Sequence, residues 1–268
     1  MLRYVRKFID GKKLYVDEPQ DPAAATSSLL YYPFGDENLD FSSVGEYDRW
    51  LKSHGKWIES APRIILTGQM GVSDSLVAQL ERTGNIVYPV NVIQSFIAKG
   101  HADSIDASAV INMAHGRMGD EVVRWLTAQN IPLFAPVNAN RDYNEWMADK
   151  MGMNGGFMSQ SIVTPEIDGA IRPYTLFAHF EGRDGLPYVE AIPGRLDDFV
   201  ATVNNYTALS RKDNKDKKLA IFYFKGPGQS ALVAEGMEVA PSLFNLLSRL
   251  KDEGYQVNGC LLYTSDAA

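Results

Sequence analysis

The sequence predicts an α/β fold made of doubly wound units with a parallel sheet, of the flavodoxin-like or periplasmic-binding-protein-like kind. Two observations lead to this prediction. Between residues 61 and 137, short apolar runs bounded by turn residues alternate with amphipathic segments. Strands that alternate with helices form parallel sheets through right-handed crossovers. The same alternation begins again near residue 217, which indicates the start of a second β/α unit.

The first unit follows an irregular stretch at 1–35 and a helix that opens at a capping box formed by Ser43 and Glu46. The apolar face of this helix is expected to carry Tyr47, Trp50 and Leu51. Within the unit, the expected strands are 63–67, 86–90, 109–113 and 131–135, and the expected helices run from Ser73 to Gly84, from 92 to 97 with an end at Gly100, and from 120 to 129.

The elements expected beyond residue 137 are less regular. They are a helix at 141–150, strands at 161–164 and 174–180, a helix at 195–209, a charged linker at 211–218, a strand at 219–224, a helix at 242–253 and a strand at 255–257. We therefore divide the chain into an N-terminal linker and helix (1–60), the first β/α unit (61–137), a connecting region (138–216), the start of the second unit (217–259) and a tail (260–268).

The tail contains the only cysteine of the chain, Cys260. Residues 260–268 look like the translated end of a sequencing adapter, so we expect the natural sequence to stop near Gly259 and the chain to be an internal fragment of a longer protein. Residues 1–259 contain no cysteine. Disulfides, CxxC metal sites and a cysteine nucleophile are therefore excluded from them.

Composition narrows the class of protein. The 268 residues are 45% hydrophobic and 22% charged, and the formal net charge is −7, as in ordinary globular proteins. An acidic chain offers no electrostatic basis for binding nucleic acid or anionic membranes. No apolar run approaches the roughly 18–20 residues that a membrane-spanning helix needs, and the first residues lack the apolar core of a signal peptide. These features favour a cytoplasmic protein without a membrane span.

An acidic turn at residues 164–169 is the first candidate site. Glu166 and Asp168 stand two residues apart, between Pro165, which fixes its own φ, and Gly169, which permits a sharp exit. In an extended turn, both carboxylates face one cavity and offer hard oxygen ligands and a proton acceptor. The alternative is that Asp168 and Gly169 merely signal a turn and that Glu166 is solvated.

Polar residues at strand ends form a second group of candidates, because open α/β sheets bind ligands at the carboxyl ends of their strands. His115 and Arg117 follow one expected strand, and His179 lies within another. A lone histidine is more often a hydrogen-bonded structural residue than a ligand, so both interpretations stay open. Residues 67–71 also follow a strand but lack the GxGxxG spacing, which argues against a dinucleotide site.

The loop at 225–230 follows the expected strand at 219–224. Its backbone N–H groups, together with Lys225, Gly226 and Gly228, are candidates for holding an anion such as a carboxylate. The loop lacks the GxxxxGK[ST] spacing of a P-loop, so we expect ATP to bind elsewhere. The alternative is a plain flexible loop.

Several short motifs occur in an order that resembles one known family. They are Tyr-Tyr-Pro at 31–33, an acidic-aromatic helix at 46–51, and segments at 84–90, 158–169, 217–224, 237–250 and 254–255. Together they resemble the large, tetrapyrrole-binding subunit of the ATP-dependent class I metal chelatases, namely the CobN subunit of cobaltochelatase and the H-type subunit of magnesium chelatase. Tyr32 stands where that family shows a histidine, and residues 225–230 replace its Gly-rich loop.

The resemblance implies an enzyme subunit that holds a tetrapyrrole while Co²⁺ or Mg²⁺ is inserted, for instance into hydrogenobyrinic acid a,c-diamide in cobalamin biosynthesis. It implies AAA+ ATPase subunits as the partners that use ATP. It favours catalytic roles for Glu166 and Asp168. The candidates for binding the ligand, chosen from their places in the sequence, are His115, Arg117, His179, Lys225, Gly226 and Gly228, and no metal ligand is assigned. We expect the chain alone to be inactive. Two alternatives remain, a CobN-like protein that removes iron from haem and a non-catalytic module whose two lobes close on a small ligand.

Overall fold

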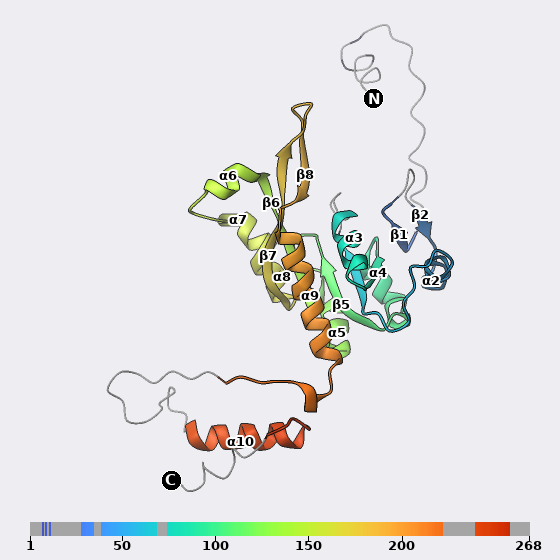
Figure 1. Cartoon of the computed structure of the whole chain (residues 1–268). Helices are drawn as coiled ribbons and strands as arrows, with labels where there is room; N and C mark the ends of the chain where they lie inside the picture. The colour runs from blue at the N-terminus through green and yellow to red at the C-terminus, as the bar shows by residue number, and fades with distance from the viewer. Residues whose placement is uncertain are drawn as a thin grey trace.

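The protein is built around a six-stranded sheet with the strand order β4-β3-β5-β6-β7-β8 (Figure 1). The computed structural model describes residues 7, 9, 11, 28–34, 39–68, 74–221 and 239–257. The strands are β3 (Arg63–Thr67), β4 (Ile86–Pro89), β5 (Ala107–Asn112), β6 (Leu133–Asp142), β7 (Ala170–Glu181) and β8 (Pro187–Ala191). Every pairing from β4 to β7 is parallel, and β8 pairs antiparallel with β7. The first five strands thus have the flavodoxin-like order, and the parallel unit predicted at 61–137 is confirmed.

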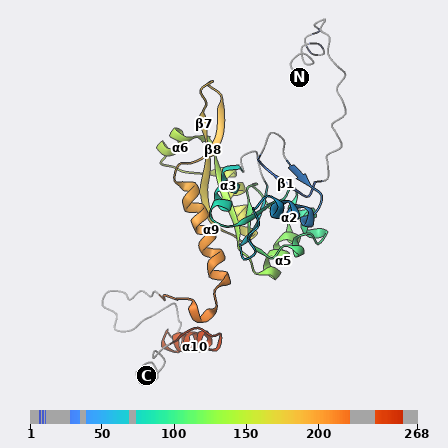
Figure 2. The same ribbon diagram turned by 45° about the vertical axis from the view of Figure 1, so that its right-hand side comes forward.

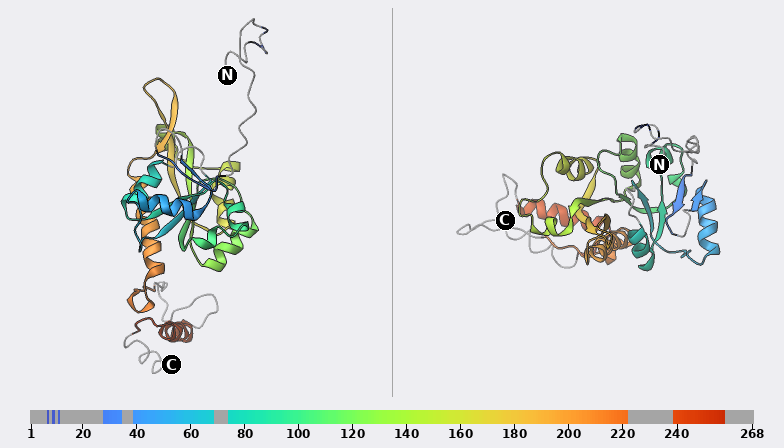
Figure 3. Two further views of the ribbon diagram at one scale, coloured as in Figure 1. Left: turned by 90° about the vertical axis from the view of Figure 1, so that its right-hand side faces the viewer. Right: turned by 90° about the horizontal axis from the view of Figure 1, so that it is seen from above.

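Helices cover both faces of this sheet. They are α2 (Val44–Ser53), α3 (Asp74–Arg82), α4 (Ile93–Ala98), α5 (Asp120–Gln129) and α9 (Arg195–Arg211). One apolar cluster joins α2, α4 and α5 to one face, and a second joins α3 and α9 to the other. Figure 3 shows α9 in orange on one side of the strands and α5 in green on the other. The sheet is therefore doubly wound, as the sequence predicts.

Alternation along each strand divides its side chains between the two clusters. In β3, Ile65 belongs to the cluster under α2, α4 and α5, whereas Ile64 and Leu66 belong to the cluster under α3 and α9. All three side chains are 0% exposed. Successive side chains of a strand point to opposite faces, so a strand buried on both faces reads as a continuous apolar run. This explains why the sequence located β3 correctly.

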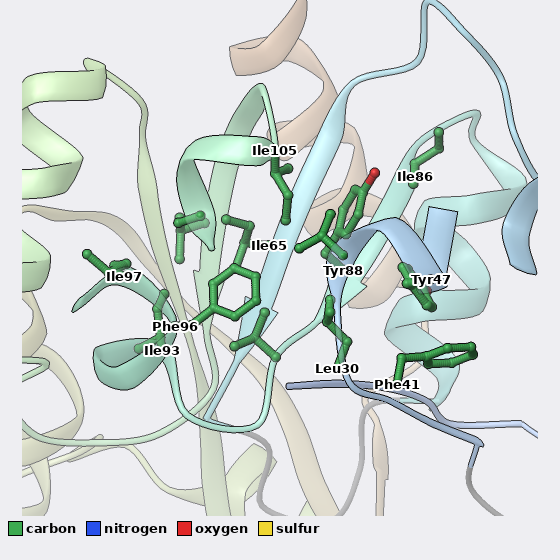
Figure 4. Close-up of a cluster of buried hydrophobic side chains, with 14 of the residues drawn as sticks. Leu30, Phe41, Tyr47, Ile65, Ile86, Tyr88, Ile93, Phe96, Ile97 and Ile105 are labelled. Carbon is green, nitrogen blue, oxygen red and sulfur yellow. The ribbon is translucent and has the colours of Figure 1, made fainter. Parts of the chain in front are cut away.

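The N-terminal part packs beside the edge strand β4. Strands β1 (Leu30–Tyr32) and β2 (Leu39–Phe41) form a small antiparallel sheet, and Leu30 makes an isolated bridge to Val90. The sequence treated residues 1–35 as irregular, so β1 is a correction. Helix α2 begins as predicted, because the Ser43 hydroxyl accepts a hydrogen bond from the Glu46 N–H at 3.2 Å. Figure 4 shows the cluster in which Leu30, Phe41 and Tyr47 meet the sheet.

Tyr47 ties α2 to the edge of the sheet. Its side chain is 0% exposed, and its hydroxyl donates to the Val87 carbonyl at 2.9 Å. Burial raises the pKa of the Tyr47 phenol well above its ordinary value, so the hydroxyl stays a donor.

We expect Tyr47→Phe to lower the free energy of unfolding by about 1–2 kcal/mol, because a buried carbonyl loses its partner. Urea unfolding followed by circular dichroism measures this change. Tyr188→Phe is the matched control, since Tyr188 is 48% exposed and its loss of a hydroxyl should cost under about 0.5 kcal/mol. Equal effects of the two substitutions would contradict the proposed role of Tyr47.

The segment between β6 and β7 is helical, so the strand predicted at 161–164 is wrong. It contains α6 (Tyr143–Ala148), α7 (Gly155–Met158), a π-helical turn at Ser159–Val163 and α8 (Thr164–Ile167). The β-branched run that suggested a strand has only a weak local preference, which tertiary packing overrides. Pro165 lies in the first turn of α8, a position that proline tolerates because no N–H is needed there.

The chain leaves the sheet along α9. Figures 1 and 2 show the β7–β8 hairpin rising beyond one end of the sheet and α9 leading to the other end, where α10 (Val239–Asp252) lies.

Helix α10 confirms the helix predicted at 242–253. Residues 219–221 and 255–257 lie in no strand, so strands predicted there are wrong over these residues, because no neighbouring strand is paired with them. Residues 222–224 and the candidates Lys225, Gly226 and Gly228 lie outside the described residues.

The described helices include none with the length and apolar character required to cross a membrane.

Candidate functional site

The strand order reverses between β3 and β5, and open α/β sheets bind ligands at such a point, at the carboxyl ends of the strands. The backbone there is tightly packed. Gly68 follows β3 with φ +70°, and a Cβ on it would lie 2.5 Å from the Ala114 N and 2.7 Å from the Ala114 Cβ. The Asn112 side chain fixes residue 114 by accepting from its N–H and donating to its carbonyl, both at 3.1 Å.

A cavity of about 280 Å³ opens at this end of the sheet. It is lined from the carboxyl ends of β5, β6 and β7, from β8 and from the helical segment between β6 and β7. The lining residues are Met113, Ala114, His115, Ala135, Pro136, Val137, Asn138, Asn140, Phe157, Ser161, Phe177, His179 and Val189. Two histidines that lie 64 positions apart in the sequence, His115 and His179, therefore border one cavity.

The two imidazole rings are available to a ligand. His115 is exposed in the loop after β5, and His179 is half-buried in β7. Among the described residues, neither ring has a hydrogen-bond, ion-pair or ring partner. A structural histidine normally holds its ring with such a partner. The geometry thus leaves both rings open toward the cavity.

Three further polar residues line the cavity. Asn138 and Asn140 come from the irregular end of β6, where the Asn140 N–H donates to the Asn138 Oδ1 at 2.9 Å. Asn140 has φ +51°, and Ser161 lies in the π-helical turn. Strained backbone and π turns concentrate at functional sites. No sequence motif singled out these three residues, although two asparagines two residues apart beyond an apolar strand lie on one face.

The loop that carries His115 is held by the segment at 159–168. The Gly116 N–H donates to the Gln160 carbonyl at 2.9 Å. The Met118 N–H donates to the Asp168 Oδ2 at 2.5 Å, and the Arg117 Nε donates to the Asp168 Oδ1. Arg117 also contacts the Asp120 carboxylate at 3.2 Å. The loop is therefore fixed at both sides of Arg117.

This arrangement differs from the extended acidic turn that the sequence suggested. The Asp168 side chain is 0% exposed, whereas Glu166 is exposed on α8. The helix turns the two carboxylates into different surroundings, because residues two apart do not share a helical face. Asp168 is occupied by Arg117 and by the Met118 N–H, while the Glu166 carboxylate has no partner among the described residues.

The rest of the described chain contains further cavities, which differ from this one in their lining residues. Within the ranges that the structure describes, no group of three or more His, Cys, Asp and Glu side chains could hold a metal ion. A second cavity of about 510 Å³ lies at the opposite end of the strands, lined in part by Leu133, Gly169, Tyr206 and Lys217. It borders the linker after α9 and does not contain the histidines.

The fold and the cavity define an open α/β protein with a cavity at the carboxyl ends of its strands. A family model described as CobN/Magnesium Chelatase matches residues 1–267, and the chain belongs to this family. The H-type subunit of magnesium chelatase from Chlorobaculum parvum is 24% identical over 255 residues, which cover 85% of this chain and 19% of that protein. The chloroplastic magnesium-chelatase protein ChlH of Oryza sativa subsp. indica is 30% identical over 117 residues, covering 43% of this chain and 8% of that protein.

A solved structure shows the same fold. The catalytic subunit of cobaltochelatase from Mycobacterium tuberculosis aligns with a TM-score of 0.60 and 20% identity over 74% of this chain and 19% of that chain. The chain thus spans about a fifth of the length of the Chlorobaculum parvum relative and of this solved structure.

Proposed function

We propose that this chain is part of the tetrapyrrole-binding subunit of an ATP-dependent metal chelatase, which inserts Co²⁺ or Mg²⁺ into a tetrapyrrole. The observation that carries the proposal is the family match over residues 1–267 together with a cavity that brings His115 and His179 to one edge of the sheet. The partners that hydrolyse ATP are AAA+ subunits, and the complex works in the cytoplasm.

The cavity holds one edge of the ring. Its volume of about 280 Å³ lies just below the range of roughly 300–1,000 Å³ that is typical of sites for whole small molecules. The face of the macrocycle then extends past Phe157, which lines the cavity and is 37% exposed. Aromatic side chains at such a mouth pack against flat rings.

Insertion of a divalent cation releases two pyrrole protons, and these protons need acceptors beside the ring. Imidazole exchanges protons in the neutral range, and no described residue occupies the ring nitrogens of the two cavity histidines. Glu166, exposed at the end of α8, offers a hard oxygen ligand to the incoming metal. Asp168 positions the His115 loop by accepting from the Met118 N–H and from the Arg117 Nε.

We expect His115→Ala and His179→Ala each to weaken binding of a metal-free tetrapyrrole by about tenfold, the cost of one lost hydrogen bond in a largely desolvated site. Quenching of ring fluorescence by the full-length gene product measures the affinity. His54→Ala is the matched control, because the His54 ring lies at the end of α2 and already contacts the Trp50 carbonyl at 2.8 Å. Wild-type affinity and chelation rate in both cavity variants would refute the proposed site.

A further inference from the structure

The cavity of about 510 Å³ at the end of the strands opposite to the histidines shares no described lining residue with the site above. Its walls come from the carboxyl end of α5, the first residues of β6 and β7, the C-terminal part of α9 and the linker that leads to α10. Figure 1 shows this linker between α9 and α10. The volume is typical of sites for small molecules, roughly 300–1,000 Å³, and such sites often lie between two structural units.

The floor of this cavity is apolar. Leu126 and Leu133 are 5% and 3% exposed, and Tyr206 is half-buried. At the mouth of the cavity, Leu209 and Leu219 are 51% and 58% exposed. These two leucines come from α9 and from the linker, so an apolar body held between them would remove both side chains from water, which is favourable.

The linker beside this floor is positively charged. Residues 211–218 contain five basic and two acidic side chains, although the net charge of the whole chain is −7. Lys217 and Lys218 line the cavity. The Lys217 ammonium donates to the Asn214 Oδ1 at 2.8 Å, whereas the exposed Lys218 side chain has no hydrogen-bond or ion-pair partner among the described residues. Lys218 is therefore available to pair with an anion.

The carboxylates near the cavity do not neutralise this charge. Asp168 is the one carboxylate among the described lining residues, and it already pairs with Arg117. In the linker, Asp213 pairs with Lys215 at 3.4 Å, and Asp216 does not line the cavity. An anion in the cavity would thus meet no unpaired carboxylate among the described residues that line it.

The linker is held in place by contacts to the residues at the end of α10. The Asn214 Nδ2 donates to the Glu253 carbonyl at 2.7 Å. The Lys217 ammonium lies 6.0 Å from the centroid of the Tyr255 ring, which also lines the cavity. The wall that carries Lys218 is therefore a built part of the cavity.

We propose that this second cavity binds an amphipathic anion, a molecule with an apolar body and a single anionic head such as a carboxylate. The apolar body lies between Leu209 and Leu219, and the head lies at the Lys218 ammonium. The inference goes beyond the proposed function, because this cavity takes no part in the chemistry at the histidines. A cationic molecule with the same apolar body would gain the apolar contact but would be repelled by the ammonium groups.

The test compares decanoate with decyltrimethylammonium, which carries the same hydrocarbon chain and the opposite charge. Isothermal titration calorimetry of the full-length gene product measures both affinities. We expect decanoate to bind about tenfold more tightly than the cation and to weaken as salt is added, because salt screens exposed charges. Equal affinities, or no binding of decanoate, would overturn the inference.

Lys218→Met locates the head group, because methionine keeps an apolar stem and removes the charge. We expect it to weaken decanoate about fivefold, as for a solvent-exposed ion pair. Lys215→Met is the matched control, since Lys215 is paired with Asp213 and does not line the cavity. Equal losses in the two variants would show a general effect of net charge and would sink the inference.

Leu209→Ser locates the apolar body. We expect it to weaken decanoate about tenfold, because part of the apolar contact is lost. Leu186→Ser is the control at another exposed leucine, 64% exposed before β8, and it should leave the affinity unchanged. Equal affinities of the two variants would contradict the proposed position.

A structural role for Lys218 gives a different result. Basic side chains near the carboxyl end of a helix stabilise its dipole, and α9 ends at Arg211. If Lys218 serves only that purpose, Lys218→Met will lower the temperature of thermal unfolding and leave the affinity for decanoate unchanged. That outcome would refute the proposed site.

Discussion

Replacing Asp168 by asparagine is expected to lower the free energy of unfolding by about 2–3 kcal/mol. Asparagine keeps the shape but loses the charge, and its NH₂ group must face either the Arg117 Nε or the Met118 N–H, which are both donors. The Arg117 side chain is 42% exposed, so water can rehydrate it, and this limits the loss. Urea unfolding measures the change, and Glu166→Gln, at an exposed carboxylate two residues away, should stay within about 0.5 kcal/mol of the wild type.

The same substitution separates a positioning role from direct contact with the ring. If Asp168 acts by holding the His115 loop, then Asp168→Asn weakens ring binding in the wild type but adds nothing once His115 is alanine. Tetrapyrrole affinities of the two single variants and the double variant complete this cycle. Additive losses in the double variant would instead place Asp168 against the ring or the metal, as the sequence first suggested.

Gly68→Ala is expected to destabilise the protein by about 2–4 kcal/mol, since it combines left-handed backbone strain with overpacking. The new methyl group would press on the Asn112 side chain and on the backbone of Ala114. Both belong to the junction of β3 and β5, where neither strand can move without breaking the sheet. Denaturant unfolding measures the loss of stability, and the tetrapyrrole affinity should fall with it, because Ala114 lines the cavity.

Gly116→Ala isolates the backbone-strain part of this effect, so its difference from Gly68→Ala gives the steric part. Gly116 has φ +86°, but a Cβ on it meets nothing within 4 Å. Its substitution should therefore cost only the backbone strain, about 1–2 kcal/mol. If the two variants lose equal stability, the close approach of β3 to the loop after β5 contributes nothing measurable.

The parallel core was predictable because its signals are local and repeated. β3, β4 and β5 are short apolar runs buried on both faces, and the helices between them carry clear apolar stripes. The end of β6 was missed, because Asn138 to Asp142 is polar and extended only through its pairing with β7. β8 was missed for the same reason, since it depends on the antiparallel pairing with β7.

Several residues of the candidate site could be predicted one at a time from the sequence, but their arrangement around one cavity could not. The sequence singled out His115 after one strand and His179 within another, and only the strand order β5-β6-β7 brings both to one cavity. Asp168 was singled out by its neighbours Pro165 and Gly169, yet its partner Arg117 lies 51 positions earlier. No spacing rule reveals such a contact, because it depends on a helical segment where the local sequence favoured a strand.

Phe177 belongs to two parts of the molecule. Its ring is 2% exposed in the cluster beneath α3 and α9, and it also lines the cavity. Ligand binding in the cavity and the stability of the domain are therefore linked thermodynamically. A ligand present at a hundredfold its Kd would add about 2.7 kcal/mol to the stability of the whole domain. Substitutions in that cluster that displace the Phe177 ring will change ligand binding as well, although they lie outside the cavity.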